Sequence, residues 1–156
     1  MTIDLITICK KADSWIDTAF KNYNKRLPKQ WQLNLIEIPP LKYNKSTSSA
    51  KIKEQESTLI KNKIKNNSCI ISLDEHGKQL TSMQLAKQIK IFTEQHHNIC
   101  FIIGGAEGLD QAVLDGSKII LGLSNLTFPH QLVRVILAEQ IYRSWTILQN
   151  HPYHRD

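Results

Sequence analysis

Residues 121–148, LGLSNLTFPHQLVRVILAEQIYRSWTIL, contain the end of an apolar strand, a short loop and a long helix. Pro129 suits the first turn of that helix, because its ring fixes φ near the helical value. The 19 residues after it contain no glycine or proline and would form a helix about 28 Å long. Apolar residues cover more of this helix than the single stripe that a surface helix buries. They are Leu132, Val133, Val135, Ile136, Leu137, Ile141, Tyr142, Trp145 and Leu148.

The loop before the helix is also unusually apolar for a solvated turn. Polar loops normally consist of turn-forming residues such as Asn, Asp, Ser and Gly. We therefore expect this loop to cover another group. It combines two hydroxyls and an amide with three large apolar side chains: Ser124, Thr127 and Asn125 with Leu123, Leu126 and Phe128.

Strands and helices alternate along the rest of the chain. Apolar runs predict strands at 3–9, 33–38, 68–73, 99–103 and 118–121, and periodicity and caps predict helices near 13–27, 51–65, 81–95 and 110–115. In the first helix, Trp15 and Ile16 are expected in the core. The strands are apolar on both faces, which is typical of a mostly parallel sheet with helices on both faces. The sequence therefore predicts an α/β fold in one domain, residues 1–156.

Composition indicates a soluble, cytoplasmic protein. The chain has 156 residues, of which 41% are hydrophobic and 22% charged, as in ordinary globular domains. Its apolar runs are too short for a signal peptide or a membrane span. Cys9, Cys69 and Cys100 lie in apolar runs without CxxC spacing, so we expect buried, reduced thiols and no metal.

The net charge of +6 is concentrated in the first half of the chain. Residues 1–65 contain 13 Lys and Arg against 6 Asp and Glu, and residues 66–156 contain 7 against 8. Such asymmetry is typical of a protein that binds a polyanion, although lysine enrichment for solubility explains it equally well.

Three predicted strand ends have unusual residues. They are Leu73-Asp74, Ile103-Gly104-Gly105 and Leu121-Gly122-Leu123. Ligands of open parallel sheets bind at the carboxyl ends of strands, and glycine lets the backbone approach a ligand, although tight turns also use it. The chain has neither GxGxxG after the first strand nor GxxxxGK[ST], and these loops lack Lys and Arg. We therefore expect a nearly neutral, partly apolar ligand such as an adenosine without phosphates.

Three motifs resemble the ribosomal RNA large-subunit methyltransferase H family of the SPOUT (α/β-knot) methyltransferases. They are FIIGGAEGL at 101–109, LSNLTFPHQLVRVILAEQIYR at 123–143 and NHPYHRD at 150–156. The similarity spans the chain and includes the segment 35–39 and Leu73-Asp74. Ala106 departs from the family, in which proline is common at this position.

This resemblance implies an S-adenosylmethionine-dependent enzyme with a C-terminal trefoil knot. It implies methylation at N3 of a pseudouridine in 23S rRNA, on the assembled 70S ribosome. It also implies a homodimer, which suits the wide apolar surface of the 130–148 helix. By family match, the cofactor contacts are Leu73, Gly104, Gly105, Leu123, Ser124, Asn125, Leu126, Thr127 and Phe128.

The C-terminal tail contains the candidate catalytic residues. Methyl transfer from a sulfonium is an in-line displacement in which the protein mainly aligns donor and acceptor. Because N3 of pseudouridine is protonated at neutral pH, a base or a stabiliser of the developing anion is needed. The candidates are His151, Tyr153, His154 and Arg155 in the tail and Arg134 and Arg143 on the 130–148 helix. Of these we select Tyr153, His154 and Arg155 as catalytic, and the resemblance implies that the tail completes the site of the partner subunit. The residue that removes the proton is left unassigned.

Several alternatives stay open. The tail could instead be a frayed terminus, and His151 with His154 would need a third ligand to bind a metal. Glu107 could face the cofactor or be solvated, and Glu139 with Arg143 has the spacing of a helical ion pair. A non-catalytic RNA-binding module and a flavodoxin-like domain are the other functional hypotheses.

Overall fold

Five parallel strands form the centre of the computed structural model, which describes residues 1–155. The strand order is β2-β1-β4-β3-β5, and every neighbouring pair is parallel. The predicted parallel α/β sheet is therefore confirmed. Asp156, the last residue of the NHPYHRD motif, lies outside the described residues. The strands are β1 (Thr2–Ile8), β2 (Leu33–Ile38), β3 (Ser68–Gln79), β4 (Asn98–Ile103) and β5 (Ile119–Gly122).

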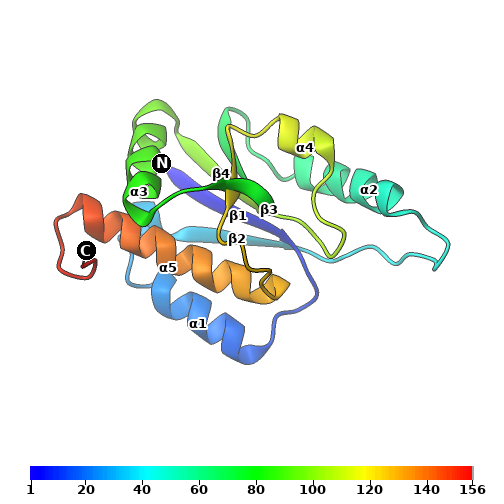
Figure 1. The fold of residues 1–156 in the computed structure, drawn as a ribbon, viewed down its shortest axis with the longest axis horizontal. Coiled ribbons are helices and arrows are strands. Elements are labelled where there is room, and N and C mark those ends of the chain that lie inside the picture. Colours follow the sequence, from blue (N-terminus) through cyan, green and yellow to red (C-terminus); the bar gives the residue numbers. More distant parts are fainter. Residues whose placement is uncertain (156) are drawn as a thin grey trace.

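Helices cover both faces of the sheet (Figure 1). One layer contains α1 (Ser14–Asn24), α3 (Ser82–Gln95) and α5 (His130–Leu148), with α5 packed between the other two. The opposite layer contains α2 (Ser49–Lys61) and the short α4 (Gln111–Asp115), and a 3-10 turn, η1 (Lys29–Trp31), precedes β2. Each layer has its own core, one including Phe20, Ile89 and Leu137 and the other including Ile60 and Val113.

Three helices, α2, α3 and α4, begin at side chains that accept from their first N–H groups. Thr81 and Gln84 form a capping box at the start of α3, in which each side chain accepts from the backbone N–H of the other. Ser48 and Asp110 accept from the first turns of α2 and α4 in the same way. Pro129 precedes α5 as the sequence predicts.

The third strand is longer than predicted. It does not end at Leu73: after a register shift, Lys78 and Gln79 continue the pairing with β5, so that Leu73 and Lys78 both align with Leu121. Gly77 permits this close approach, since a Cβ there would lie 2.6 Å from the backbone N of Gly122. The extension brings residues 74–79 over the loop that follows β5.

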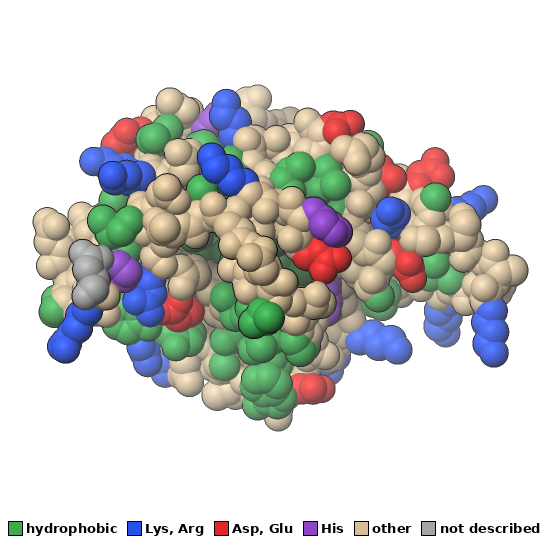
Figure 2. Space-filling model, viewed as in Figure 1, with side chains coloured by type: hydrophobic (Ala, Val, Ile, Leu, Met, Phe, Trp, Pro, Cys, Tyr) green, Lys and Arg blue, Asp and Glu red, His purple; other side chains and the backbone are tan. Residues whose placement is uncertain are grey.

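The expected core position of Trp15 is wrong, because this side chain is 59% exposed. Successive residues of a helix point roughly 100° apart, and the sheet-facing positions of α1 are Ile16 and Phe20. Hydrophobic side chains gather on the surface over α5 and the N-terminal end of α1 (Figure 2). Along α5, Leu132, Val135 and Ile136 are only partly buried. The helix thus retains apolar surface beyond the face that packs on its own sheet.

The trefoil knot stays a prediction. Two features are consistent with a knot. β5 lies at the sheet edge beside β3, and the chain passes from β5 into the layer of α1 and α3.

Candidate functional site

A cavity of about 710 Å³ lies at the carboxyl ends of β3, β4 and β5, and is called here the strand-end cavity. It brings together the three strand ends that the sequence singles out. Eight of the nine predicted cofactor residues line it: Leu73, Gly104, Gly105, Leu123, Ser124, Leu126, Thr127 and Phe128. Asn125 is not among its lining residues, and its side-chain oxygen accepts a hydrogen bond from Gln79.

One wall of the cavity is a turn of backbone after β4. Gly108 has φ of +85° and donates its N–H to the carbonyl of Gly105 over 3.0 Å. A Cβ at Gly104 would lie 2.9 Å from the carbonyl carbon and oxygen of Gly108, so no larger residue fits without moving backbone. Gly104 is therefore required for space and Gly108 for its positive φ.

Charges around the strand-end cavity are mainly negative. Asp74, Glu75 and Glu107 line it, and Lys53 of α2 supplies an ammonium group. The hydroxyl of Thr127 donates to Glu75 over 3.2 Å, which ties the loop after β5 to the extension of β3. The sequence did not indicate Lys53, because nothing local to α2 predicts that it reaches these strand ends.

Apolar side chains also face the strand-end cavity. Leu126 is 71% exposed although it is a large apolar residue, and Leu123 and Phe128 are partly buried beside it. Leu73 is almost fully buried at the base. The cavity therefore combines an apolar surface, peptide groups and carboxylates, which suits a partly apolar ligand that carries positive charge.

An ion pair with one buried partner fixes the N-terminal half of α5 against the sheet and holds Arg134, one of the candidate residues, inside the fold. The guanidinium of Arg134 donates from Nη1 to Glu37 Oε1 over 2.6 Å and from Nη2 to Cys9 Sγ over 2.7 Å. Its side chain is 2% exposed, whereas that of Glu37 is 40% exposed. Burial is the largest effect on Cys9 and raises the pKa of its thiol, which favours the neutral form. All three cysteines are free and buried, as predicted.

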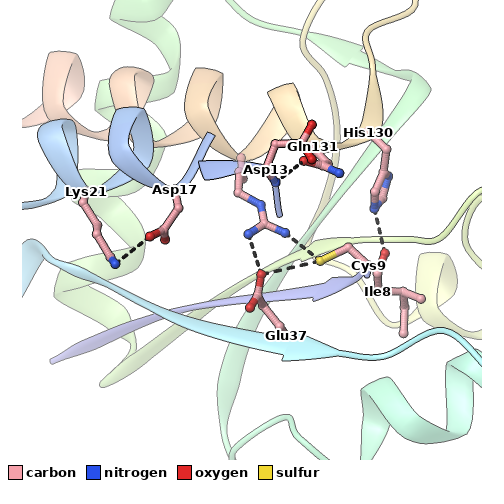
Figure 3. Close-up of polar contacts among 9 residues, drawn as sticks. Ile8, Cys9, Asp13, Asp17, Lys21, Glu37, His130 and Gln131 are labelled. Carbon is pink, nitrogen blue, oxygen red and sulfur yellow. Dashed lines mark hydrogen bonds and ion pairs between the residues drawn. The ribbon is translucent and has the colours of Figure 1, made fainter. Parts of the chain in front are cut away.

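Two further contacts surround this ion pair (Figure 3). His130, which lines the strand-end cavity, lies with Nε2 2.7 Å from the carbonyl oxygen of Ile8. Because a carbonyl only accepts, Nε2 carries the proton. The backbone N–H of Asp13 donates to Gln131 Oε1 over 3.0 Å. The start of α5 is thus joined to the ends of β1 and β2, and this joint fixes one side of the cavity.

We expect His130 to make the folded protein less stable in acid. Burial, reinforced by the charge of Arg134, lowers the pKa of His130 below its ordinary value of 6.5. The unfolded chain then binds more protons than the folded one, so stability is lost as the pH falls below about 6.5. The free energy of unfolding should therefore fall less steeply between pH 6.5 and 5 in His130→Gln than in the wild type. Equal slopes in urea titrations across this range would contradict the expectation.

Two of the predicted catalytic residues, Tyr153 and His154, pack against the C-terminal half of α5. Tyr153 donates its hydroxyl to Glu139 over 3.1 Å, and its ring centroid lies 4.8 Å from that of Tyr142. Arg143 lies over the Tyr153 ring at 4.9 Å, and its Nη1 lies 3.2 Å from His154 Nδ1. The tail is thus held in contact with α5. Arg155 is exposed.

Tyr153 is a hydrogen-bond donor in this arrangement. Burial and the carboxylate of Glu139 raise the pKa of Tyr153 to about 12. The phenol therefore stays protonated at neutral pH. Glu139 also accepts from Arg143 over 2.5 Å, as the i,i+4 spacing predicts.

The tail and the strand-end cavity of one chain lie at different parts of α5. His130 and Val133 line the cavity, whereas Tyr142 and Arg143 contact the tail. Val133 and Tyr142 are nine residues apart, a rise of about 13 Å along the helix. Figure 1 shows the C-terminus beyond the end of α5 that is remote from residue 130. The structure therefore does not bring the predicted catalytic residues to the cofactor residues of the same chain.

Within residues 1–155, no group of three or more His, Cys, Asp or Glu side chains is arranged to hold a metal ion. His151 Nδ1 accepts from the backbone N–H of Tyr153 over 3.2 Å. No helix of the described chain is long and apolar enough to cross a membrane.

Known proteins resemble this chain over nearly its full length. A family model described as "Predicted SPOUT methyltransferase" matches residues 1–154. Ribosomal RNA large subunit methyltransferase H of Legionella pneumophila (strain Paris) is 43% identical over 155 residues, which cover 99% of both chains. The protein of that name from Hydrogenovibrio crunogenus is 40% identical over 156 residues and the full length of both.

A solved structure of similar fold is a probable methylase family protein from Haemophilus influenzae Rd KW20. It superimposes with a TM-score of 0.60 at 11% identity, covering 99% of this chain and 70% of the other. At this identity, the likeness to that structure shows a shared fold alone. Because the family model and the full-length relatives both match, the chain belongs to the SPOUT methyltransferases, and within them to the ribosomal RNA large subunit methyltransferase H family.

Proposed function

We propose that the protein transfers a methyl group from S-adenosylmethionine to N3 of a pseudouridine in 23S rRNA. The observation that carries this proposal is the strand-end cavity, in which eight predicted cofactor residues from three separate parts of the sequence meet. The names of the full-length relatives support large-subunit ribosomal RNA as the substrate.

The strand-end cavity has the chemistry that this cofactor requires. Leu123, Leu126 and Phe128 would contact the apolar faces of the adenosine, and peptide groups of the 104–108 turn would bind its polar edges. The cofactor supplies a methyl group activated by a sulfonium cation. The carboxylates of Asp74, Glu75 and Glu107 favour such a positive charge, and the predominance of carboxylates disfavours a phosphate.

The tail would act on the nucleotide. Removal of the N3 proton leaves an anion on the base, which a guanidinium or a hydroxyl donor stabilises. Arg155 and the protonated Tyr153 have these properties, and the imidazole of His154 lies beside them in the tail. We assign the binding of the base to these three residues together and assign the proton acceptor to none of them.

A homodimer would bring the tail to a cavity. The partly exposed apolar residues of α5 provide a surface that a second copy can cover, and a twofold interface would place each tail against the partner in the same way. In the described part of the chain, its own tail lies along the C-terminal half of α5, away from its own cavity. This separation supports a site shared between two chains.

We place the reaction on the assembled 70S ribosome in the cytoplasm. The surplus of Lys and Arg in residues 1–65 supplies a surface for a polyanionic substrate. Lys10 and Lys11, directly after β1, and Lys42 and Lys45, before α2, are exposed. These positions are available for contacts with rRNA phosphates.

Calorimetry with S-adenosylhomocysteine tests the cofactor assignment. We expect saturable binding with a Kd well below about 1 mM, a binding free energy stronger than about −4 kcal/mol. Leu126→Arg should weaken binding, because it replaces an apolar contact with the adenosine by a long charged side chain at the mouth of the cavity. Lys29→Ala, on the distant turn η1, is a matched surface control. Absence of binding at millimolar ligand would contradict the proposal.

A further inference from the structure

Glu56 of α2 is a buried carboxyl group that lies outside the predicted site. Its residue surface is 4% exposed, and Oε2 has no hydrogen-bond partner within the described chain. Burial of a carboxylate without a partner is costly, so a charged or polar side chain is seldom found in such a position without a specific role. An apolar residue at this position of α2 would fill the same space with a smaller free-energy cost of burial.

The Glu56 carboxyl group packs directly against the turn that forms one wall of the strand-end cavity. A Cβ built on Gly105 would lie 2.7 Å from Glu56 Oε2 and 2.9 Å from Oε1. The carboxyl therefore occupies the place that any side chain at residue 105 would need. Gly105 lines the cavity and accepts from Gly108 N–H, so Glu56 supports this turn from the side of α2.

The groups around Glu56 favour its neutral form. Burial raises the pKa of Glu56, and the negative charge of Glu107 raises it further. Glu107 lies in the same turn and lines the cavity. The phenol of Tyr43 also has a raised pKa, first from burial and then from Glu56. Lys53, one turn earlier in α2, supplies the basic group of the cavity. A protonated carboxyl tolerates burial far better than a carboxylate.

We propose that Glu56 is a positioning residue for the cofactor: its carboxyl group holds the Gly105–Gly108 turn in the position that closes one wall of the strand-end cavity. This role rests on the proposed function of that cavity. It also explains why residue 105 is glycine, because a methyl group there would displace either the carboxyl or the turn. Glu56 itself is not among the residues lining the cavity.

A residue that positions the turn and a residue that only stabilises the fold predict different effects of Glu56→Ala on ligand affinity and on unfolding. Alanine removes the support under the turn and also removes a buried polar group that lacks a partner. We expect S-adenosylhomocysteine to bind about tenfold more weakly, since small displacements of binding groups have large effects. The midpoint of urea unfolding should stay the same or rise, whereas a purely structural residue would lower it. Glu56→Gln has nearly the same shape and should bind within about threefold of the wild type.

A double-mutant cycle tests the contact itself. Gly105→Ala places a methyl group 2.7 Å from Glu56 Oε2 and should weaken binding. Glu56→Asp withdraws the carboxyl by one methylene, so it should weaken binding alone but improve binding when combined with Gly105→Ala. Such non-additivity is the signature of two groups in contact. Glu54→Ala, which removes an exposed carboxylate from the same helix, is the charge-matched control and should bind normally.

The calorimetric results decide between the outcomes. Weaker binding in Glu56→Ala at an unchanged unfolding midpoint, normal binding in Glu56→Gln, and rescue of Gly105→Ala by Glu56→Asp would support the positioning role. Wild-type affinity in Glu56→Asp, or additive effects in the double variant, would overturn the positioning role. These two variants still test the role if Glu56→Ala does not fold. If the wild-type protein itself fails to bind S-adenosylhomocysteine, the proposed function fails instead.

Discussion

Glu37→Ala is expected to destabilise the protein more than Arg134→Met, although the two residues form one ion pair. Alanine at 37 leaves the guanidinium of Arg134, which is 2% exposed, without its counter-charge. Loss of one partner from a buried pair lowers the free energy of unfolding by about 3–5 kcal/mol. Methionine at 134 removes the charge, fills similar space and leaves Glu37, which is 40% exposed, in contact with water. A loss below about 2 kcal/mol is expected for that variant.

Urea denaturation at pH 7 measures this difference. Asp17→Ala is the matched control, because it breaks an exposed pair with Lys21 and should change the free energy of unfolding by less than about 0.5 kcal/mol. Equal losses for Glu37→Ala and Arg134→Met, or the reverse order, would mean that the pair does not hold α5 to the sheet in the way described.

Replacement of His154 and Arg155 by alanine should reduce methyl transfer by at least about 100-fold. The affinity for S-adenosylhomocysteine should change little, because neither residue lines the strand-end cavity. Leu126→Arg should also lose methyl transfer, but because it weakens cofactor binding; its tail residues are unchanged. Each variant alone is therefore expected to be nearly inactive.

A mixture of the two inactive variants tests whether the site is shared between chains. If equal amounts are denatured and refolded together, half of the proposed dimers should contain one chain of each kind, and each such dimer should have one complete site. Methyl transfer should recover to about a quarter of the wild-type rate. Activity that stays at the level of the separate variants would contradict a shared site.

Features that depend on local residue patterns could be predicted from the sequence. Both faces of the strands are apolar because both are buried, so the parallel sheet was predictable. Gly104 and the loop 123–128 were recognisable as unusual because strands normally end in polar turns. Long-range features could not be predicted in this way. Lys53 and Glu56 reach the strand ends only through the packing of α2, and Arg134, a candidate for contact with the substrate, is buried against Glu37 of β2.

The errors also have physical causes. β3 seemed to end at Leu73 because the next residues are polar, yet the backbone approach of Gly77 to Gly122 continues the pairing. Trp15 has a large apolar side chain, as core residues often do, but it does not lie on the buried face of α1. The catalytic role of Tyr153 and His154 stays a prediction, and their contacts with Arg143 and Glu139 place them on α5, away from the strand-end cavity of the same chain.

Nucleotide-level mapping of methyl groups is the most direct test of the proposed reaction. The enzyme and S-adenosylmethionine would be added to 70S ribosomes and to free 23S rRNA that lack the modification, with Leu126→Arg as the inactive control. We expect a single new methyl group at N3 of a pseudouridine in the 23S rRNA of the 70S particles, and little or none on the free rRNA. No methylation of 23S rRNA in either sample would contradict the assignment.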